Sequence, residues 1–153
     1  MIKYHRMNNT NIFDVVNEYV NYYNNYENGC WTKEKAYKRI HQIMNIDDSL
    51  CYLQYDDDKL VGFVMSYYKE FDDLKALYIE EIVVFKEYQN KGYGKQMMNH
   101  IEKEAINSGV EHIELLSVND EHHKHFYESL GYYSASNVSA KDRPSPKMKI
   151  NVS

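Results

Sequence analysis

One apolar segment, residues 77–85, constrains the fold of this chain more than any other feature. It is rich in Ile and Val and shows little alternation of polar and apolar residues, which predicts a central strand covered on both faces. A glycine-containing loop follows, and apolar residues then recur at helical spacing up to Ser108-Gly109, a typical helix stop. Residues 112–118 predict another buried strand. A strand, a helix and a strand in this order predict a parallel pair with a right-handed crossover.

Further strands and helices are predicted around this β-α-β unit. One helix is expected after Asn11, which with Asp14 makes a suitable N-cap, and another after Thr32, a second N-cap. A short helix is expected at residues 121–130, with Gly131 just beyond its end. Strands are expected at residues 2–6, at 50–55 and 60–68 as a hairpin, from Tyr132 onward, and at 147–152.

Length and charge bound the class of protein. The 153 residues suit a single α/β domain over 1–153. The formal net charge of −5 excludes a general nucleic-acid binder, which needs an excess of Lys and Arg, and it favours cationic small molecules. We recognise no signal peptide, no apolar run long enough to cross a membrane and no CxxC pair, so we expect a cytoplasmic protein with reduced thiols.

The loop after residues 77–85 has the pattern of an anion-binding site. Its sequence, Gln89-Asn90-Lys91-Gly92-Tyr93-Gly94, places two glycines where a helix begins. Backbone N–H groups at a helix start are unpaired and lie at the positive end of the dipole, and glycines let a phosphate approach them. Lys91 and Lys95 add positive charge. The pattern is neither a Walker loop nor a dinucleotide fingerprint. The alternative is a glycine-containing turn that only starts a helix.

Two segments together resemble the GNAT N-acetyltransferase superfamily. Residues 77–94, ending in Gln-x-x-Gly-x-Gly, look like the family's central strand and acetyl-CoA loop. Residues 125–132, His-Phe-Tyr-Glu-Ser-Leu-Gly-Tyr, resemble the family's later helix-then-strand segment and follow at the expected distance. The resemblance covers nearly the whole chain. It implies a GNAT-like single domain with a mixed, mostly antiparallel central sheet, a splayed parallel pair and about four flanking helices.

The resemblance also implies the cosubstrate and its contacts. Acetyl-CoA would be used without a metal, its pyrophosphate held by the loop backbone and its pantetheine arm paired with the backbone of Ile82 and Val84. One of these N–H groups would also face the thioester carbonyl. Many family members place an Asn where this chain has Asp120, so either the neighbouring Asn119 serves or the contact differs. The implied cofactor-binding residues are Ile82, Val83, Val84, Gln89, Asn90, Lys91, Gly92, Tyr93, Gly94, Lys95, Asn119 and Phe126.

Candidate catalytic residues follow from the same resemblance. The family often has a Tyr at the position of Tyr127, whose hydroxyl would protonate the leaving thiolate, although a core aromatic is the alternative. An alkyl amine is mostly protonated at neutral pH, so its attack needs a base. Glu80 and Glu81 are carboxylates in an apolar strand, an unusual place for them. Glu80 is favoured because polyamine-type family members carry Glu there, and Glu81 is the second choice.

Other roles for these residues stay open. The two glutamates would also suit the end of a sheet or the binding of a lysine, and His123 is an alternative base. His122, His123 and His125 lack the cysteine or carboxylate partners of a metal site, so we expect no metal.

The resulting functional expectation is an acetyl-CoA-dependent N-acetyltransferase acting on a primary amine of a small, cationic acceptor. Acidic turns such as 56–58 favour a cationic acceptor if they line its site, but they are equally consistent with solvated turns. The alternatives are a catalytically inactive CoA-binding sensor or interaction module, and an enzyme acting on peptide or protein amines. We expect no nucleic-acid or membrane partner, and the family resemblance allows a homodimer.

Overall fold

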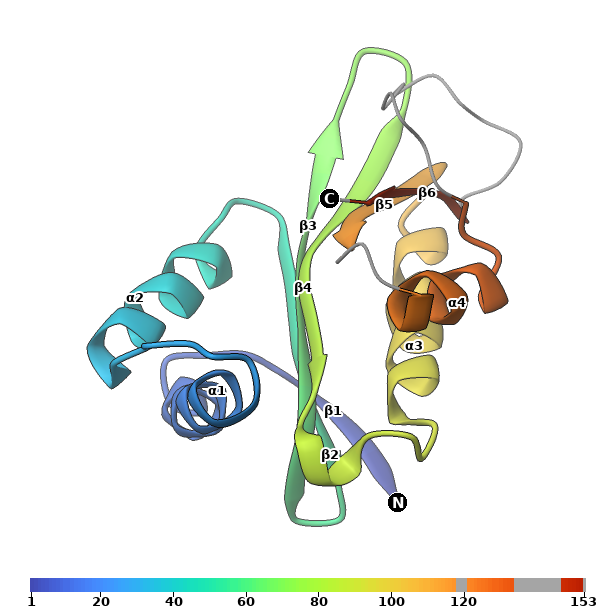
Figure 1. The fold of residues 1–153 in the computed structure, drawn as a ribbon. Coiled ribbons are helices and arrows are strands. Elements are labelled where there is room, and N and C mark those ends of the chain that lie inside the picture. The colour runs from blue at the N-terminus through green and yellow to red at the C-terminus, as the bar shows by residue number, and fades with distance from the viewer. Residues whose placement is uncertain (118–120, 134–146, 153) are drawn as a thin grey trace. The chain divides into compact units, whose positions relative to one another are not determined.

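A computed structural model describes residues 1–117, 121–133 and 147–152 (Figure 1). The sequence folds into alternating strands and helices, and its central apolar segment becomes one long strand. In chain order the elements are β1 (Ile2–Arg6), α1 (Ile12–Tyr26), α2 (Lys33–Met44), β2 (Ser49–Asp56), β3 (Lys59–Glu70), β4 (Lys75–Val84), the short 3-10 helix η1 (Lys86–Tyr88), α3 (Tyr93–Asn107), β5 (His112–Ser117), α4 (Glu121–Ser129) and β6 (Lys147–Val152).

The strands form one sheet in the order β1-β2-β3-β4-β5-β6. Strands β1 and β2 are antiparallel, whereas β4 and β5 are parallel, as the β-α-β pattern predicts. Strand β6 also runs parallel to β5. The mixed α/β sheet with a parallel pair is therefore confirmed. The strand expected from Tyr132 onward is not: Tyr132 and Tyr133 have no strand structure, and residues 134–146 lie outside the described part of the chain.

The chain groups into two compact units. Unit 1 comprises residues 1–65 and 82–97, and unit 2 comprises residues 66–81 and 98–153. Strands β3 and β4 and helix α3 each contribute residues to both units, so the division falls within elements and not at a linker.

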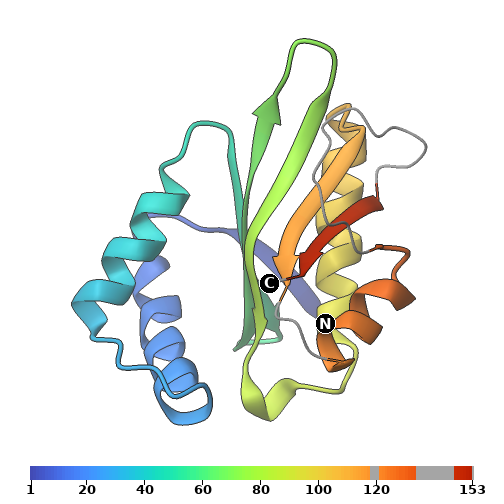
Figure 2. The same cartoon turned by 45° about the horizontal axis from the view of Figure 1, so that its top comes forward.

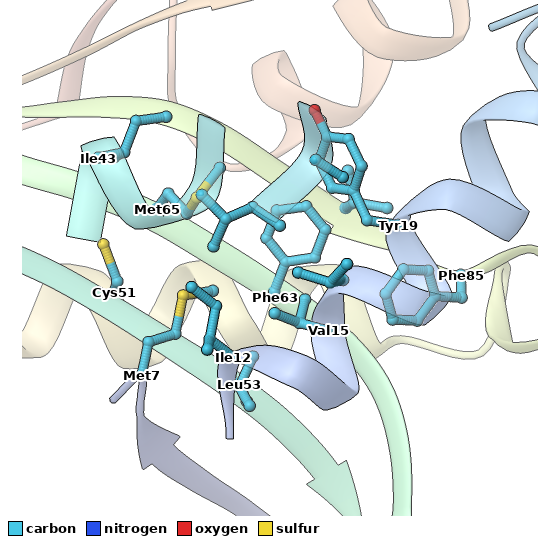
Figure 3. Packing of buried hydrophobic residues seen from close by; sticks show 14 residues of the cluster. Met7, Ile12, Val15, Tyr19, Ile43, Cys51, Leu53, Phe63, Met65 and Phe85 are labelled. Atoms are coloured by element: carbon cyan, nitrogen blue, oxygen red, sulfur yellow. The ribbon is translucent and has the colours of Figure 1, made fainter. Parts of the chain in front are cut away.

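The core of unit 1 forms between the apolar faces of α1 and α2 and the strands that they cover (Figure 3). Helix α1 buries Ile12, Val15, Val16 and Tyr19, the 3.6-residue spacing that the sequence shows. The ring of Phe63 on β3 lies 5.8 Å from that of Tyr19 and 5.9 Å from that of Phe85. Each such side chain contributes about 1.5–3 kcal/mol when fully buried, so this cluster stabilises the segment that leads into the glycine loop.

The two predicted helix caps have different outcomes. Thr32 is extended (φ −100°, ψ 160°), and its hydroxyl accepts the Lys35 N–H at 3.1 Å, as expected. Asn11 has helical angles (φ −79°, ψ −8°) and makes no side-chain cap bond, so that prediction is wrong. Its amide instead accepts from the Asn8 N–H and donates to the Arg6 carbonyl, which ties the end of β1 to the start of α1.

Unit 2 packs the later part of α3 and helix α4 on one side of β5 (Figure 2). Its buried residues include Ile101 and Ala105 of α3, Ile113 and Leu115 of β5, and Tyr127 of α4. The Tyr132 hydroxyl donates to the buried Glu102 carboxylate at 2.7 Å, which connects the end of α4 to α3. Within the described residues, no helix is both long and apolar enough to cross a membrane.

Candidate active site

The loop between η1 and α3 has the geometry of an anion-binding helix start. Asn90 and Gly92 both have positive φ, 63° and 89°, and α3 begins at Tyr93. The Gln96 N–H donates to the Gly92 carbonyl at 3.1 Å, which leaves the preceding N–H groups as the open end of the helix. A Cβ built on Gly92 would meet nothing closer than the Gln96 amide nitrogen at 3.9 Å. The space over Gly92 is open, and Lys91 and Lys95 are exposed beside it, an arrangement that suits phosphate groups.

The Gln89 side chain anchors the loop from within. Its amide nitrogen donates to the Val84 carbonyl at 2.9 Å and to the Tyr22 hydroxyl at 3.3 Å. The Tyr22 hydroxyl in turn donates to Glu27 at 3.0 Å, and burial is the main cause that raises the pKa of Tyr22. The structure therefore brings the end of β4, the loop and α1 together through one glutamine. It also gives the Val84 carbonyl a partner within the chain.

The backbone at residues 82–84 lies beyond the paired part of the parallel strands. The β4–β5 register runs from Ala76↔His112 to Ile79↔Leu115, although β4 continues to Val84 and β5 to Ser117. On the β3 side, the Phe85 N–H donates to the Val61 carbonyl at 2.9 Å. Ile82 and Val84 are half-buried, whereas Val83 is buried. The pairing of β4 with β5 therefore lies within unit 2 and ends at Ile79.

Gly62 makes a close approach between β3 and β4 in this region. A Cβ at Gly62 would lie 2.5 Å from the Val83 carbonyl oxygen and 3.3 Å from the Val84 Cα. Real side chains do not tolerate the shorter distance, so only glycine fits without a shift of the β4 backbone. The sequence analysis did not identify Gly62. An isolated glycine inside an otherwise apolar strand is a signal of close backbone approach that would have pointed to it.

Glu80 and Glu81 directly follow Ile79, the last residue of β4 that pairs with β5, and both belong to unit 2. Both are half-buried. Within the described residues, the Glu80 side chain has no hydrogen bond or ion pair, whereas Glu81 takes part in an interaction. Unlike Glu81, the Glu80 carboxylate is therefore available to bind a substrate, as far as the described residues show.

Tyr127 is the buried residue of α4, with 5% of its surface exposed. Its ring lies 5.0 Å from Phe126, which is half-buried, and 6.1 Å from Tyr132. Burial raises the pKa of Tyr127 to about 12, so the hydroxyl keeps its proton at neutral pH. No described residue forms a hydrogen bond with that hydroxyl. Asn119 and Asp120, the two candidates for a pantetheine contact, lie outside the described residues.

The histidines of α4 form no metal centre among the described residues, where no group of three or more metal-ligating side chains is found. The rings of His122 and His123 lie 5.7 Å apart in an edge-to-face contact. His122 and His125 are exposed, and His123 is half-buried.

The sequence and the fold have counterparts in known proteins. The profile of the Acetyltransferase (GNAT) family matches residues 14–132. L-ornithine N5-acetyltransferase NATA1 from Arabidopsis thaliana is 30% identical over 79 residues, which is 50% of this chain and 35% of that protein. The match therefore spans about a third of the length of this curated relative.

Solved structures share the fold across almost the entire chain. The crystal structure of a possible acetyltransferase from Clostridium difficile 630 superposes with a TM-score of 0.76 at 18% identity, covering 94% of this chain and 97% of that one. An aminoglycoside N-acetyltransferase in complex with CoA gives a TM-score of 0.71 at 13% identity, covering 94% and 95%. At such identities the likeness shows the fold alone. The family profile, however, spans most of the sequence, and the chain belongs to the acetyltransferase (GNAT) family.

Proposed function

We propose that this chain is an acetyl-CoA-dependent N-acetyltransferase that acetylates a primary amine of a small, cationic acceptor. One observation carries the proposal: the glycine loop at the start of α3 is open over Gly92 and flanked by exposed lysines, in a chain of the GNAT family. A turn that only started a helix would not need this open space beside positive charge. The family uses acetyl-CoA, and a CoA complex is among the proteins of the same fold.

The loop would hold the phosphates of the cosubstrate. Backbone N–H groups between Asn90 and Lys95 would face the phosphates at the start of α3, where an anion is favoured by roughly 0.3–1 kcal/mol per charge before direct hydrogen bonds are counted. The Gln89 N–H already donates to the Lys86 carbonyl at 3.3 Å, so Gln89 would contribute through its side chain. The exposed Lys91 and Lys95 add positive charge. The backbone of Ile82 and Val84, unpaired with β5, would bind the pantetheine amides, with the Val84 carbonyl shared with Gln89. Val83, Asn119 and Phe126 complete the proposed contacts.

Acetyl-CoA supplies an acetyl group already activated as a thioester, so the protein needs chiefly to manage protons and orientation. Glu80 is our candidate for accepting the amine proton, because it is half-buried and has no partner among the described residues. Tyr127 is our candidate proton donor, because its hydroxyl has no partner among the described residues and, like any tyrosine hydroxyl, carries its proton at neutral pH. A backbone N–H of residues 82–84 would stabilise negative charge on the carbonyl oxygen.

The acceptor class rests on charge and on the relatives. The net charge of −5 favours a cationic amine over an anionic one. The curated relative is named for acetylation of ornithine, and the CoA-bound protein of similar fold for acetylation of aminoglycosides, both of which are small amines. Peptide and lysine amines are the competing acceptors.

Thermal unfolding with added acetyl-CoA tests the proposal. A ligand that binds only the folded chain stabilises it by about 2.7 kcal/mol at a hundredfold excess over its Kd, so the unfolding temperature should rise with ligand concentration. Dephospho and desulfo analogues separate phosphate contacts from thioester contacts. Release of free thiol with a panel of di- and polyamines should then identify an enzyme. Binding without thiol release would indicate an inactive CoA-binding module, and the absence of any shift at millimolar ligand would overturn the proposal.

A further inference from the structure

Two side chains of strand β2 form hydrogen bonds with Tyr93, the first residue of α3. The Gln54 amide nitrogen donates to the Tyr93 carbonyl at 3.0 Å, and the Tyr93 hydroxyl donates to the Asp56 carboxylate in a short hydrogen bond. Residues 54 and 56 are two apart on a strand, so their side chains lie on one face. All three residues belong to unit 1, together with the whole loop from Gln89 to Gly94. The helix start is therefore tied to the sheet through both its backbone and its side chain.

Gln54 is an unusual residue for its place. It follows a run of buried residues, 50–53, and is itself fully buried, with 0% of its surface exposed. Its amide nitrogen also donates to the Tyr4 hydroxyl at 3.1 Å, across the β1–β2 pair. Its amide oxygen is buried with no hydrogen-bond partner among the described residues. A leucine would fill this site without burying an unsatisfied oxygen, so packing alone does not explain the glutamine.

Tyr93, the residue bonded to Gln54, directly follows the loop residues that have positive φ. Asn90 and Gly92 both have positive φ, and Gly92 directly precedes Tyr93. A segment of this kind has many conformations of similar energy, and a ligand that selected one would lose affinity to the entropy of ordering it. Anchors on Tyr93 remove that freedom before any ligand arrives.

We propose that Gln54 and Asp56 are positioning residues that hold Tyr93, and with it the 89–94 loop, in the form that binds the phosphates of acetyl-CoA. The inference rests on the proposed function, because it assigns these residues a role in cosubstrate affinity. Neither residue touches the ligand in this scheme. Gln54 acts through the Tyr93 carbonyl and Asp56 through the Tyr93 hydroxyl, so both contribute to KM for acetyl-CoA and little to kcat.

The experiment measures CoA affinity and the stability of the ligand-free protein in the same variants. Gln54→Leu removes the bonds to Tyr93 and to Tyr4 together with the unsatisfied oxygen. The lost bonds and the removed unsatisfied oxygen have opposite effects on stability, so the ligand-free unfolding temperature should change little, while the Kd of CoA rises by about three- to tenfold, the usual value of one hydrogen bond. Tyr93→Phe removes only a hydroxyl and should also weaken CoA binding. In turnover, KM for acetyl-CoA should rise in Gln54→Leu with kcat nearly constant.

A double-mutant cycle tests the second anchor. Asp56→Asn and Tyr93→Phe both act on the Tyr93–Asp56 hydrogen bond, so the double variant should bind CoA no more weakly than the weaker single variant. Asp56→Asn also weakens the contact of Asp56 with the N-terminal ammonium at 3.2 Å, which is present whether or not Tyr93 is changed. The matched control is Tyr68→Phe, which removes a hydroxyl bonded to Ser108 at 3.2 Å in unit 2 and should leave the Kd of CoA unchanged.

The outcomes separate this inference from the proposed function. Failure of the unaltered protein to bind CoA overturns both. Normal binding by the unaltered protein with equal affinity in Gln54→Leu and Tyr93→Phe overturns the inference alone. A lower unfolding temperature in Gln54→Leu at unchanged affinity assigns Gln54 to structure and also overturns it. If Gln54→Leu does not fold, Tyr93→Phe and the cycle with Asp56→Asn decide the question.

Discussion

Two residues of the proposed reaction centre, Tyr127 and Glu80, carry polar groups that have no hydrogen-bond partner among the described residues. The Tyr127 side chain is buried, and its hydroxyl has no hydrogen-bond partner among the described residues. Phenylalanine would fill the same space. Glu80 is a half-buried carboxylate without a described partner, just past the residues of β4 that pair with β5. Polar groups left without a partner in the chain are expected where a substrate uses them.

Replacement of Tyr127 by phenylalanine tests its role as proton donor. The ring and its contacts with Phe126 and Tyr132 would remain, so the protein should fold and bind CoA as before. Loss of the hydroxyl should lower kcat by about 10²-fold or more, the usual contribution of a general acid. Steady-state kinetics at saturating acetyl-CoA measure this. Turnover equal to that of the unaltered protein would make Tyr127 a core aromatic only.

The pair Glu80→Gln and Glu81→Gln decides which carboxylate accepts the amine proton. Both changes keep size and remove charge, so each variant controls for the other. We expect kcat/KM for the amine to fall by about 10²-fold or more in Glu80→Gln, with a much smaller change in Glu81→Gln. The rate of Glu80→Gln should recover as pH rises and the amine deprotonates without help. The reverse ranking would assign the base to Glu81, and two active variants would direct attention to His123.

A buried charge cluster in unit 2 gives a pH prediction. The Glu114 carboxylate contacts the His112 ring at 3.1 Å and the Lys69 ammonium at 3.1 Å. The hydrogen bond from His112, followed by that from Lys69, lowers the pKa of Glu114 below its ordinary value of 4.5. Because the pKa of Glu114 is lower in the folded protein, its contacts with His112 and Lys69 stabilise the fold fully at pH values above 4.5. This stabilisation is lost as the pH falls through the pKa of Glu114 in the folded protein.

The free energy of unfolding in urea, measured against pH, tests that sign. Glu114→Gln should destabilise the protein most at neutral pH, and the difference from the unaltered protein should shrink at pH values below 4.5. Glu70→Gln is the control, because its pair with Lys75 at 3.8 Å is exposed and should matter little at any pH. If the free energy of unfolding of Glu114→Gln differed from that of the unaltered protein by the same amount at every pH, the effect would come from packing and not from charge.

Residue-level prediction from the sequence succeeds where a single local rule applies. Thr32 caps α2 because its extended backbone turns the hydroxyl toward the Lys35 N–H. Asn11 fails the same rule because its amide is bonded to Asn8 and Arg6, contacts that depend on how β1 leads into α1. The roles of Gln54 and Asp56 depend on β2 meeting a helix start some forty residues later, which no local pattern encodes.

At the scale of elements, the close approach at Gly62 fixes how β4 lies against β3. The sequence indicates that residues 77–85 form a buried strand, and the structure places most of them in β4. It does not indicate where the strand stops pairing with β5, because that point depends on the backbone geometry near Val83 and not on residue type. Of the strand expected from Tyr132 onward, only Tyr132 and Tyr133 are described, and neither has strand structure; Tyr132 packs on Tyr127 and bonds to Glu102.

Gly62→Ala tests that packing. The new Cβ would lie 2.5 Å from the Val83 carbonyl oxygen, so the β4 backbone must shift, and overpacking of this kind costs about 1–3 kcal/mol. Urea unfolding should show that loss, and the Kd of CoA should rise because residues 82–84 move. Adding Met97→Leu relieves only the contact at 3.3 Å with a flexible side chain and should not restore stability. If the double variant regained the stability of the unaltered protein, the overpacking would lie at the Met97 side chain and not at the β4 backbone.

For the molecule as a whole, the sequence predicts the family and the mixed sheet but not the acceptor. Family and fold follow from two motifs in order, and the match over residues 14–132 bears them out. An acceptor site has no comparable signature, because it is defined by side chains from several elements that share no spacing in the sequence. Net charge is the one whole-chain property that bears on the acceptor, and it leads to a measurable expectation.

The net charge of −5 should attract a polycationic acceptor over distances that salt can screen. Screening shortens the reach of charge from about 10 Å at 0.1 M salt to about 3 Å at 1 M. At saturating acetyl-CoA, kcat/KM for a triamine should therefore fall as salt rises, and the fall should be shallower for a monoamine of similar length. The monoamine serves as the control because both acceptors react through the same primary amine. A salt-independent rate for the triamine would show that the acceptor is chosen by shape and local contacts, and it would remove the charge argument for a polyamine substrate.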